Sequence, residues 1–258
     1  MIKKMTEEFK ASVQKELLSD KTSALQKYRS LVLGRGGVWS LLKYEMLTLL
    51  FSWVPGALGL WLRKIFYKPL FLKVGKGVVF GRNITLRHPH KISIGDRSFI
   101  DDNVVLDAKG EENEGISLGS NVLIGRNTII TCKEGSISID DYCNISANCF
   151  LLSETIIQLG KYCFLAGQCY LVAGGNHSFE DTSRPIMFQP SISKGGICIE
   201  EDVWLGAGAV VLDGVKLGKG SVFGAGSVIN GSFPEYSIAM GIPARFVKSR
   251  KKGTNTPG

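Results

Sequence analysis

The sequence predicts a mainly β fold, in which short strands wind as a parallel coil of triangular cross-section after a helical N-terminal segment. A six-residue rhythm of aliphatic or Phe residues runs from Val74 to Ile229. The insertions that interrupt this rhythm all fall at the same one of three corners. The chain has 258 residues, of which 44% are apolar, so it can bury a full core and most of it is expected to be ordered.

The N-terminal segment, residues 1–72, is expected to be helical. Within residues 1–30, the apolar residues that recur at helical spacing are Phe9, Val13, Leu17 and Leu18. They predict a charged amphipathic helix. The opening MIKKMTEEFK places charges where a secretory signal needs an unbroken apolar core, so we expect a cytoplasmic protein.

Residues 46–62, MLTLLFSWVPGALGLWL, carry no charge, but they are fewer than the roughly twenty residues that span a bilayer. Pro55 and Gly56 interrupt the run. Trp39, Trp53 and Trp61 are suited to a membrane interface, and several lysines follow, as expected beside anionic headgroups. We expect two short helices that lie on or dip into the inner face of the cell membrane. The alternatives are a helical pair packed against the first coil or a subunit axis, and a full span.

Each triplet of apolar guide residues is expected to form one coil, with a short strand and a turn from each six-residue unit. The steps within triplets are always six, and those between triplets are 8, 12, 9, 8, 28 and 6. Stacked coils would pair as parallel strands about 4.8 Å apart and bury the guide residues. The guide residues are Val74, Phe80, Leu86, Ile94, Ile100, Leu106, Leu118, Ile124, Ile130, Ile139, Ile145, Leu151, Leu159, Leu165, Leu171, Ile199, Leu205, Val211, Leu217, Phe223 and Ile229.

Four of the six cysteines occupy a second slot, two residues before a guide residue, where other coils have small or β-branched side chains. They are Cys143, Cys149, Cys163 and Cys169. We interpret them as small core residues stacked one coil apart. The absence of an export signal argues against a disulfide framework, and the absence of paired CxxC elements argues against structural zinc.

The longest insertion, between Leu171 and Ile199, contains the stretch GGNHSFED and one of the three histidines, His177. A long excursion from a regular coil usually has a function, so the loop at residues 173–197 is the candidate active site. A lone loop histidine is more often simply solvated. The neighbouring acids Glu180 and Asp181 either orient the His177 ring or are solvated as well.

The remaining histidines, His88 and His90 in RHPHK, suggest a metal site because some proteins with such coils bind zinc through three histidines. They lie four coils from His177, roughly 19 Å at about 4.8 Å per coil. Zinc holds its nitrogen ligands at about 2.1 Å. We therefore expect no metal site.

The repeat, the block EDVWLGAGAVVLDGVKLGKGSVFGAGSV and the ending YSIAMGIPARFVK resemble the hexapeptide-repeat acyltransferases, among them the maltose and galactoside O-acetyltransferases and the polysaccharide O-acetyltransferases. The resemblance covers about residues 74–248. It implies a left-handed parallel β-helix of about seven coils, assembled as a homotrimer with acetyl-CoA bound between neighbouring subunits. No metal takes part.

The resemblance also implies roles for single residues. His177 would be the general base, a role that suits an imidazole with a pKa near 6.5. The N–H of Ala207 would stabilise the oxyanion. Asn148 and Trp204 would contact the acceptor, with Glu180 and Asp181 nearby, although an Asn is also common in a tight corner.

The contacts to acetyl-CoA that the resemblance implies involve Trp204, Gly206, Ala207, Ala225, Arg245 and Lys248. Of these, Arg245 and Lys248 match basic residues near the nucleotide phosphates. Two departures from the family pattern stand out. His177 lies six residues past Leu171 instead of the usual five, and Asn230 and Gly231 replace a common Thr-Lys pair.

We therefore expect an acetyl-CoA-dependent O-acetyltransferase domain at residues 73–248, followed by a flexible basic tail at 249–258. The expected acceptor is a sugar hydroxyl of a surface polysaccharide or of a lipid-linked precursor. The alternatives are a non-catalytic β-helix scaffold, and a transferase for another acyl chain or an amine. The net charge of +8 favours anionic partners such as an anionic membrane surface, but no recognition motif indicates nucleic-acid binding.

Overall fold

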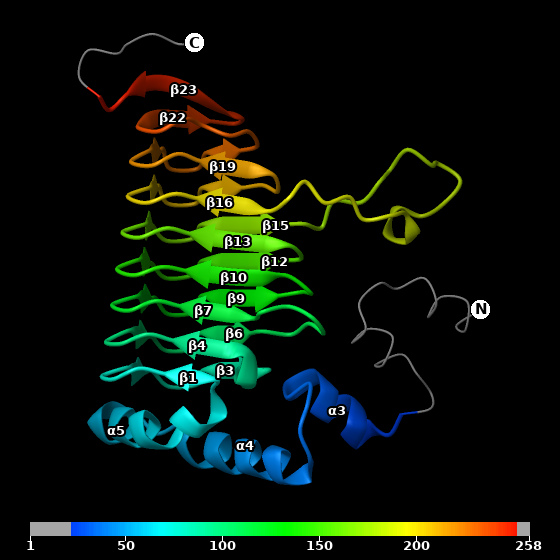
Figure 1. Ribbon diagram of the computed structural model, residues 1–258, viewed down its shortest axis with the longest axis vertical. Helices are drawn as coiled ribbons and strands as arrows, with labels where there is room; N and C mark the ends of the chain where they lie inside the picture. The colour runs from blue at the N-terminus through cyan, green and yellow to red at the C-terminus, as the bar shows by residue number, and fades with distance from the viewer. Residues whose placement is uncertain (1–21, 252–258) are drawn as a thin grey trace.

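In the computed structural model, which describes residues 22–251, the chain winds into parallel coils stacked along one long axis (Figure 1). The helices lie across the N-terminal end of the stack, and a long loop projects from its side (Figure 1). The parallel β-helix and the N-terminal helical segment expected from the sequence are both confirmed.

Each coil contributes one strand to each of three sheets. The first sheet contains β1 (Lys73–Val74), β4 (Ile92–Ile94), β7 (Ile116–Leu118), β10 (Ser136–Ile139), β13 (Ile156–Leu159), β16 (Ile197–Ile199) and β19 (Val215–Leu217). The second contains β2 (Val79–Phe80), β5 (Phe99–Ile100), β8 (Leu123–Ile124), β11 (Asn144–Ile145), β14 (Phe164–Leu165), β17 (Trp204–Leu205), β20 (Val222–Phe223), β22 (Ser237–Gly241) and β23 (Ala244–Ser249). The third contains β3 (Thr85–Arg87), β6 (Val105–Asp107), β9 (Ile129–Cys132), β12 (Phe150–Ser153), β15 (Tyr170–Ala173), β18 (Val210–Val211) and β21 (Val228–Ile229).

The stack comprises seven complete coils and the start of an eighth. An isolated parallel bridge between Phe233 and Leu217 begins the eighth coil on the first sheet, and β22 continues it by pairing in parallel with β20. The chain then reverses, because β23 pairs antiparallel with β22. The predicted count of about seven coils therefore holds, with a partial coil closing the C-terminal end.

The guide residues form the core. Twenty of the twenty-one are at most 2% exposed, and Val74 in the first coil is partly buried against them. The register stacks them in columns, as where Ile139 lies opposite Leu118 on one side and Leu159 on the other. The four cysteines of the second slot are buried and free, as expected of core side chains.

The corners require backbone conformations that few residues adopt easily. Asn103, Asn127 and Asn148 have φ values of 58°, 59° and 60°, in the left-handed region that Asn tolerates better than most residues. Glycine serves a different purpose at Gly206, where an added Cβ would lie 2.5 Å from the nitrogen of Ala225 in the next coil. The coils therefore stack too closely at this corner for a side chain.

Between residue 22 and the first coil, the structure has three helices and a 3-10 turn: α3 (Ala24–Val32), α4 (Val38–Phe51), α5 (Gly56–Phe66) and η1 (Lys68–Leu70). The helix predicted within residues 1–30 lies mostly outside the described residues. The expected break at Pro55 and Gly56 is present, since Pro55 is the N-cap of α5. Within residues 22–251, no helix is both long and apolar enough to cross a membrane.

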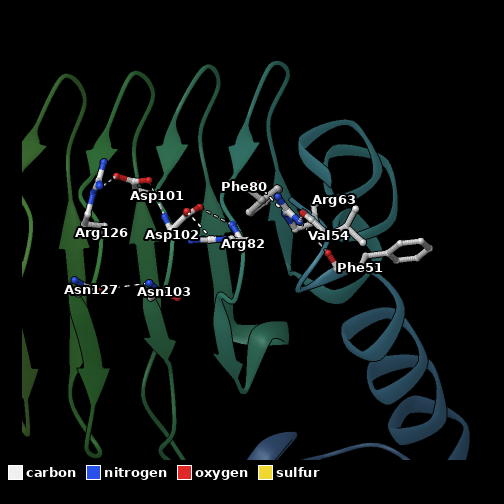
Figure 2. A network of polar contacts seen from close by, with 10 residues as sticks. All are labelled: Phe51, Val54, Arg63, Phe80, Arg82, Asp101, Asp102, Asn103, Arg126 and Asn127. Atoms are coloured by element: carbon white, nitrogen blue, oxygen red, sulfur yellow. Dashed lines mark hydrogen bonds and ion pairs between the residues drawn. The ribbon is translucent and has the colours of Figure 1, made fainter. Parts of the chain in front are cut away.

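Specific hydrogen bonds hold the helices on the first coil. Arg63 of α5, only 1% exposed, donates from Nε to the carbonyl of Phe80 at 3.0 Å and from Nη1 to the carbonyls of Phe51 at 2.9 Å and Val54 at 2.8 Å (Figure 2). The Tyr44 hydroxyl of α4 donates to the carbonyl of Leu86 at 2.7 Å. Arg63 of α5 thus joins the end of α4, the α4–α5 turn and the second sheet.

The histidine strip attaches α3. His88 precedes the 3-10 turn η2 (Pro89–Lys91), and its backbone N–H donates to the carbonyl of Val32 at 2.7 Å. The His88 ring Nε2 lies 2.9 Å from the carbonyl of Ser30, so it carries the proton that this bond needs. Among residues 22–251, no three His, Cys, Asp or Glu side chains gather as a metal site would require.

Candidate functional site

The loop that carries His177 leaves the third sheet after β15 and returns to the first sheet at β16. It contains one 3-10 turn, η3 (Ile186–Phe188), and extends away from the coils (Figure 1). The two ends of the loop lie on the β-helix, where side chains from the adjacent coils hold them.

A buried carboxylate, Asp213, holds both ends of the loop. Its Oδ2 accepts hydrogen bonds from the Asn176 side-chain amide at 3.0 Å and from the backbone N–H of Lys194 at 2.8 Å. Its Oδ1 accepts one from the N–H of Gly196 at 2.8 Å. Because Asp213 is only 6% exposed, these hydrogen bonds to a charged group form largely out of water, where they are strong.

A second carboxylate, Glu154, supports the loop from the coil below. Its Oε2 accepts from the N–H of Gly175 at 2.9 Å, and its Oε1 accepts from Lys133 Nζ at 2.6 Å. Gly174 and Gly175 have φ values of 116° and 72°, which only glycine adopts readily. The residues just before His177 are therefore held by a carboxylate on each side.

The loop also folds on itself. The N–H of Ser178 donates to the carbonyl of Pro190 at 2.8 Å, and the N–H of Ile192 donates to that of Asn176 at 2.6 Å. The buried side chain of Gln189 donates from Nε2 to the carbonyls of Asp181 at 2.7 Å and Arg184 at 3.1 Å. These bonds pair the two sides of the loop in an antiparallel arrangement around His177.

The His177 ring is oriented by a backbone carbonyl. Nδ1 lies 3.2 Å from the carbonyl oxygen of Gln189. Because a carbonyl only accepts hydrogen bonds, Nδ1 must carry the ring proton. The neutral ring then has its lone pair on Nε2, which can accept a proton from a substrate.

The two neighbouring acids, Asp181 and Glu180, have different surroundings from those of the His177 ring. The Asp181 carboxylate accepts from the N–H of Ser183 at 2.9 Å and from its hydroxyl at 2.6 Å, and these bonds hold the pKa of Asp181 below its usual value. Glu180 is exposed. From the sequence, the His177 ring could be oriented by one of these acids or by no neighbour. In the structure, the Gln189 carbonyl orients it.

Asn148 lies at another corner, between the second sheet and the third. Its Oδ1 accepts a hydrogen bond from Asn127 Nδ2 at 3.1 Å. Asn127 in turn accepts one from Asn103 at 3.2 Å (Figure 2). This ladder and its left-handed φ give Asn148 a structural role. A role in acceptor binding stays a prediction.

The predicted cofactor residues follow the second sheet toward the C-terminus. Trp204 is half exposed on β17 and stacks on Phe164, with ring centroids 6.2 Å apart. Gly206 and Ala225 lie one above the other at the corner that follows. Arg245 and Lys248 are exposed on β23, three strands beyond Trp204 and so about 14 Å along the axis.

The backbone N–H of Ala207 lies at this exposed corner. In the first coil, Asp102 Oδ1 accepts from the equivalent N–H of Arg82 at 2.8 Å (Figure 2). Among residues 22–251, no group accepts a hydrogen bond from the N–H of Ala207, nor from that of Ala225 in the next coil. These two donors are available to a bound ligand.

The predicted residues fall into two groups that one chain does not bring together. His177 projects from the corner between the third and first sheets, whereas Ala207 and Asn148 lie at the corner between the second and third. The width of the third sheet separates them. The residues that sequence analysis missed, Asp213, Glu154 and Gln189, carry no local signal, because each acts through contacts that only the folded coils create.

Two repeat models match the chain. One, described as bacterial transferase hexapeptide (six repeats), matches residues 199–231, and the other, described as the hexapeptide repeat of succinyl-transferase, matches residues 115–153.

Curated relatives share the same region. The chain is 32% identical over 166 residues to a probable acetyltransferase of Mycobacterium tuberculosis (strain ATCC 25618 / H37Rv), covering 64% of this chain and 54% of the relative. It is 39% identical over 80 residues to a galactoside O-acetyltransferase of Lactococcus lactis, covering 29% of this chain and 38% of the relative. The chain thus spans about half the length of the first relative and less of the second.

A solved structure has a similar fold. It is a variant of an N-acyltransferase from Bacillus cereus in complex with dTDP-4-amino-4,6-dideoxyglucose and coenzyme A. The TM-score is 0.51 at 25% identity, over 72% of this chain and 88% of that chain.

Proposed function

From the match of this chain to the hexapeptide-repeat acyltransferases, in repeat, relatives and fold, we propose that it transfers an acetyl group from acetyl-CoA to a sugar hydroxyl. The observation that carries the proposal is the orientation of His177. The Gln189 carbonyl fixes the proton on Nδ1 and leaves Nε2 as a base, on a loop held by two carboxylates.

The reaction follows from these groups. Nε2 of His177 accepts the proton of the acceptor hydroxyl while the oxygen attacks the thioester carbonyl. The N–H of Ala207 donates a hydrogen bond to the oxyanion of the tetrahedral intermediate. The intermediate collapses, the C–S bond breaks, and the imidazolium returns the proton to the CoA sulfur. The Gln189 carbonyl stabilises the imidazolium at Nδ1.

The site is proposed to form between two copies of the chain. His177 and Ala207 project from different corners of one β-helix, so a single copy cannot offer both to one substrate. In a homotrimer, the loop of one subunit would reach the corner of the next, and acetyl-CoA would lie along the second sheet between them. Trp204, Gly206, Ala207 and Ala225 would contact the pantetheine end, and Arg245 and Lys248 the phosphates.

The acceptor is proposed to be a sugar of a surface polysaccharide or of a lipid-linked precursor, modified at the cytoplasmic face of the membrane. Asn148 and Trp204, with Glu180 and Asp181 on the loop, are its proposed contacts. The exposed apolar helices at the N-terminal end support this location. The solved N-acyltransferase makes an amino sugar the second candidate, since that protein is bound to a dTDP-amino sugar and coenzyme A.

Thiol release from acetyl-CoA tests the proposal. The assay uses full-length protein with a panel of saccharides, nucleotide-linked amino sugars and a lipid extract, and it compares the wild type with His177→Ala. Loss of the base should lower the rate roughly 10²-fold or more, with little change in KM for acetyl-CoA. His90→Ala is the matched control and should retain activity, because His90 lies in the first coil.

Equal rates for the wild type and His177→Ala would remove His177 from the mechanism. If neither protein binds CoA nor releases thiol with any acceptor, the chain is a scaffold. Release that depends only on amino sugars would favour the N-acyltransferase candidate.

A further inference from the structure

The outward side of helix α4 is apolar. Trp39, Leu42, Met46 and Leu49 recur at steps of three and four, so they share one face of the helix, and Trp53 continues the line beyond its end. Trp39 is 84% exposed, Leu49 is 73% exposed and Trp53 is 63% exposed. Large apolar side chains exposed together in this way indicate an interaction surface.

Helix α5 also has an exposed apolar side. Leu58, Trp61 and Ile65 recur at steps of three and four and are all exposed. We name the exposed apolar residues of α4, of α5 and of the turn between them the cap face, because both helices lie across the end of the stack (Figure 1). The opposite sides of the helices, with Leu41 and Tyr44, are buried.

The cap face is held in place. Arg63 of α5 bonds the carbonyls of Phe51 at the end of α4, of Val54 in the α4–α5 turn and of Phe80 in the first coil (Figure 2). An added Cβ on Gly59 would lie 1.9 Å from the carbonyl oxygen of Val54, so the α4–α5 turn packs directly on α5. The exposed side chains therefore cannot turn inward without breaking these contacts.

The surroundings of the cap face are basic. Residues 22–76 contain nine Lys and Arg residues against one acid, Glu45, an excess of eight that equals the net charge of the whole chain. Of the exposed lysines nearby, Lys64 lies on α5, Lys68 on η1, and Lys73 and Lys76 on the first coil. Tryptophan, aliphatic residues and lysine in one place match the chemistry of an anionic lipid surface.

We infer that the cap face docks on an anionic lipid bilayer and lies in its interfacial layer. Helices of 14 and 11 residues are about 21 Å and 16 Å long, short of the roughly 30 Å apolar core of a bilayer. The apolar side chains would enter the headgroup and acyl boundary while the lysines contact lipid phosphates.

This docking deepens the proposed function, on which its biological role rests. The loop of His177 returns to the first sheet at β16, five strands from β1, which is about 24 Å along the axis. Because α4 and α5 lie between β1 and the membrane, an acceptor anchored there would need to present its sugar more than about 24 Å above the cap face. That height favours a lipid-linked glycan of several sugars over a single glycolipid headgroup.

Vesicle flotation tests the docking with the full-length chain. The probes are phosphatidylcholine vesicles and vesicles with about one third phosphatidylglycerol, at low and high salt. The wild type should float with the anionic vesicles, less with the neutral ones and less at high salt, because salt screens the lysines. Leu49→Ser with Leu58→Ser should reduce the bound fraction about tenfold or more.

The matched control changes two exposed apolar residues at the opposite end of the molecule, Ile242→Ser with Val247→Ser. It should float like the wild type. Both variants should melt like the wild type, since the four side chains are exposed.

The inference is overturned if the wild type sediments with both kinds of vesicle, or if Leu49→Ser with Leu58→Ser floats unchanged. A further outcome is a wild type that never floats but forms a larger assembly, which the Leu49→Ser with Leu58→Ser variant dissociates. In that case the cap face binds a second copy of the chain and not a bilayer. Thiol release separates the two proposals. Normal release without flotation rejects the docking alone, and flotation without release rejects the transferase alone.

Discussion

Asp213 is the single side chain on which the geometry of the loop most depends. It accepts three hydrogen bonds from the two ends of the loop, and replacing an oxygen by an NH₂ group would set a donor against a donor. Asp213→Asn should therefore destabilise the fold by about 1–3 kcal/mol and lower kcat roughly tenfold, with KM for acetyl-CoA little changed. Thermal melts and steady-state kinetics measure both effects.

Asp202→Asn is the control for this variant, because Asp202 is exposed and pairs with Arg250 at 3.3 Å. It should behave like the wild type in both assays. An unchanged kcat in the Asp213→Asn protein would show that the loop keeps its geometry without this carboxylate.

His90 makes the stability of the N-terminal end depend on pH. Burial, the nearby Arg35 and His88 lower the pKa of His90 from 6.5 to about 4. Its folded-state pKa is thus below the unfolded value, so the unfolded chain binds more protons between these values. This contribution to stability is complete above about pH 6.5 and is lost as the pH falls toward 4.

Melting temperatures measured from pH 7 to pH 4 test this point. The melting temperature of the wild type should fall more steeply than that of His90→Gln, which cannot titrate in this range. Parallel curves would show that His90 does not titrate differently in the folded and unfolded states. Burial also lowers the pKa of His88, but its ring bonds the carbonyl of Ser30, so its replacement would also loosen α3.

Sequence analysis could select His177, because it lies in the longest insertion of a regular repeat. It could not identify the group that orients the ring. The two acids three and four residues further along were the natural candidates, whereas the carbonyl of Gln189 acts through the backbone. A backbone contact leaves no trace in residue type and exists only once the loop has folded.

At the scale of elements, the attachment of the helices depends on Arg63. Lysine has one donor group on a flexible stem and cannot reproduce hydrogen bonds to three separate carbonyls. Arg63→Lys should therefore leave buried carbonyls unsatisfied and destabilise α4 and α5 by roughly 1–3 kcal/mol, while the coils keep their stability. Hydrogen exchange should show faster exchange in both helices and unchanged exchange in the strands.

Lys64→Ala is the matched control, since Lys64 is the exposed neighbour of Arg63. Its exchange pattern should equal that of the wild type. Equal protection of the helices in Arg63→Lys would mean that apolar packing alone attaches them to the coil.

The strands were far more predictable than the helices. Each strand is specified by two or three residues around a guide residue, and the coils repeat the same local rule, so the register follows from the six-residue step. The break at Pro55 was also evident from the sequence. The buried position of Arg63 could not be predicted, because an arginine that follows an apolar run is equally typical of an exposed basic flank.

At the scale of the whole molecule, the three proposed functions are separated along one axis. The cap face lies at the N-terminal end, the loop with His177 joins β15 to β16, and the proposed phosphate contacts lie on β23 at the C-terminal end (Figure 1). The β-helix sets the distances between them. Sequence analysis could order these features along the chain and assign them to corners of the coil, but it could not show how the loop extends from the stack.

We propose that the active site combines His177 of one subunit with the Ala207 corner of another subunit of a homotrimer. Co-expression of His177→Ala with Ala207→Pro, which lacks the donor N–H, tests it most directly. Each variant alone should be nearly inactive. In mixed trimers, a site with both groups intact arises at about a quarter of the interfaces, so thiol release should recover to about a quarter of the wild-type rate. Mixed trimers that stay as inactive as either variant alone would place both groups in the same subunit and rule out a site shared between subunits.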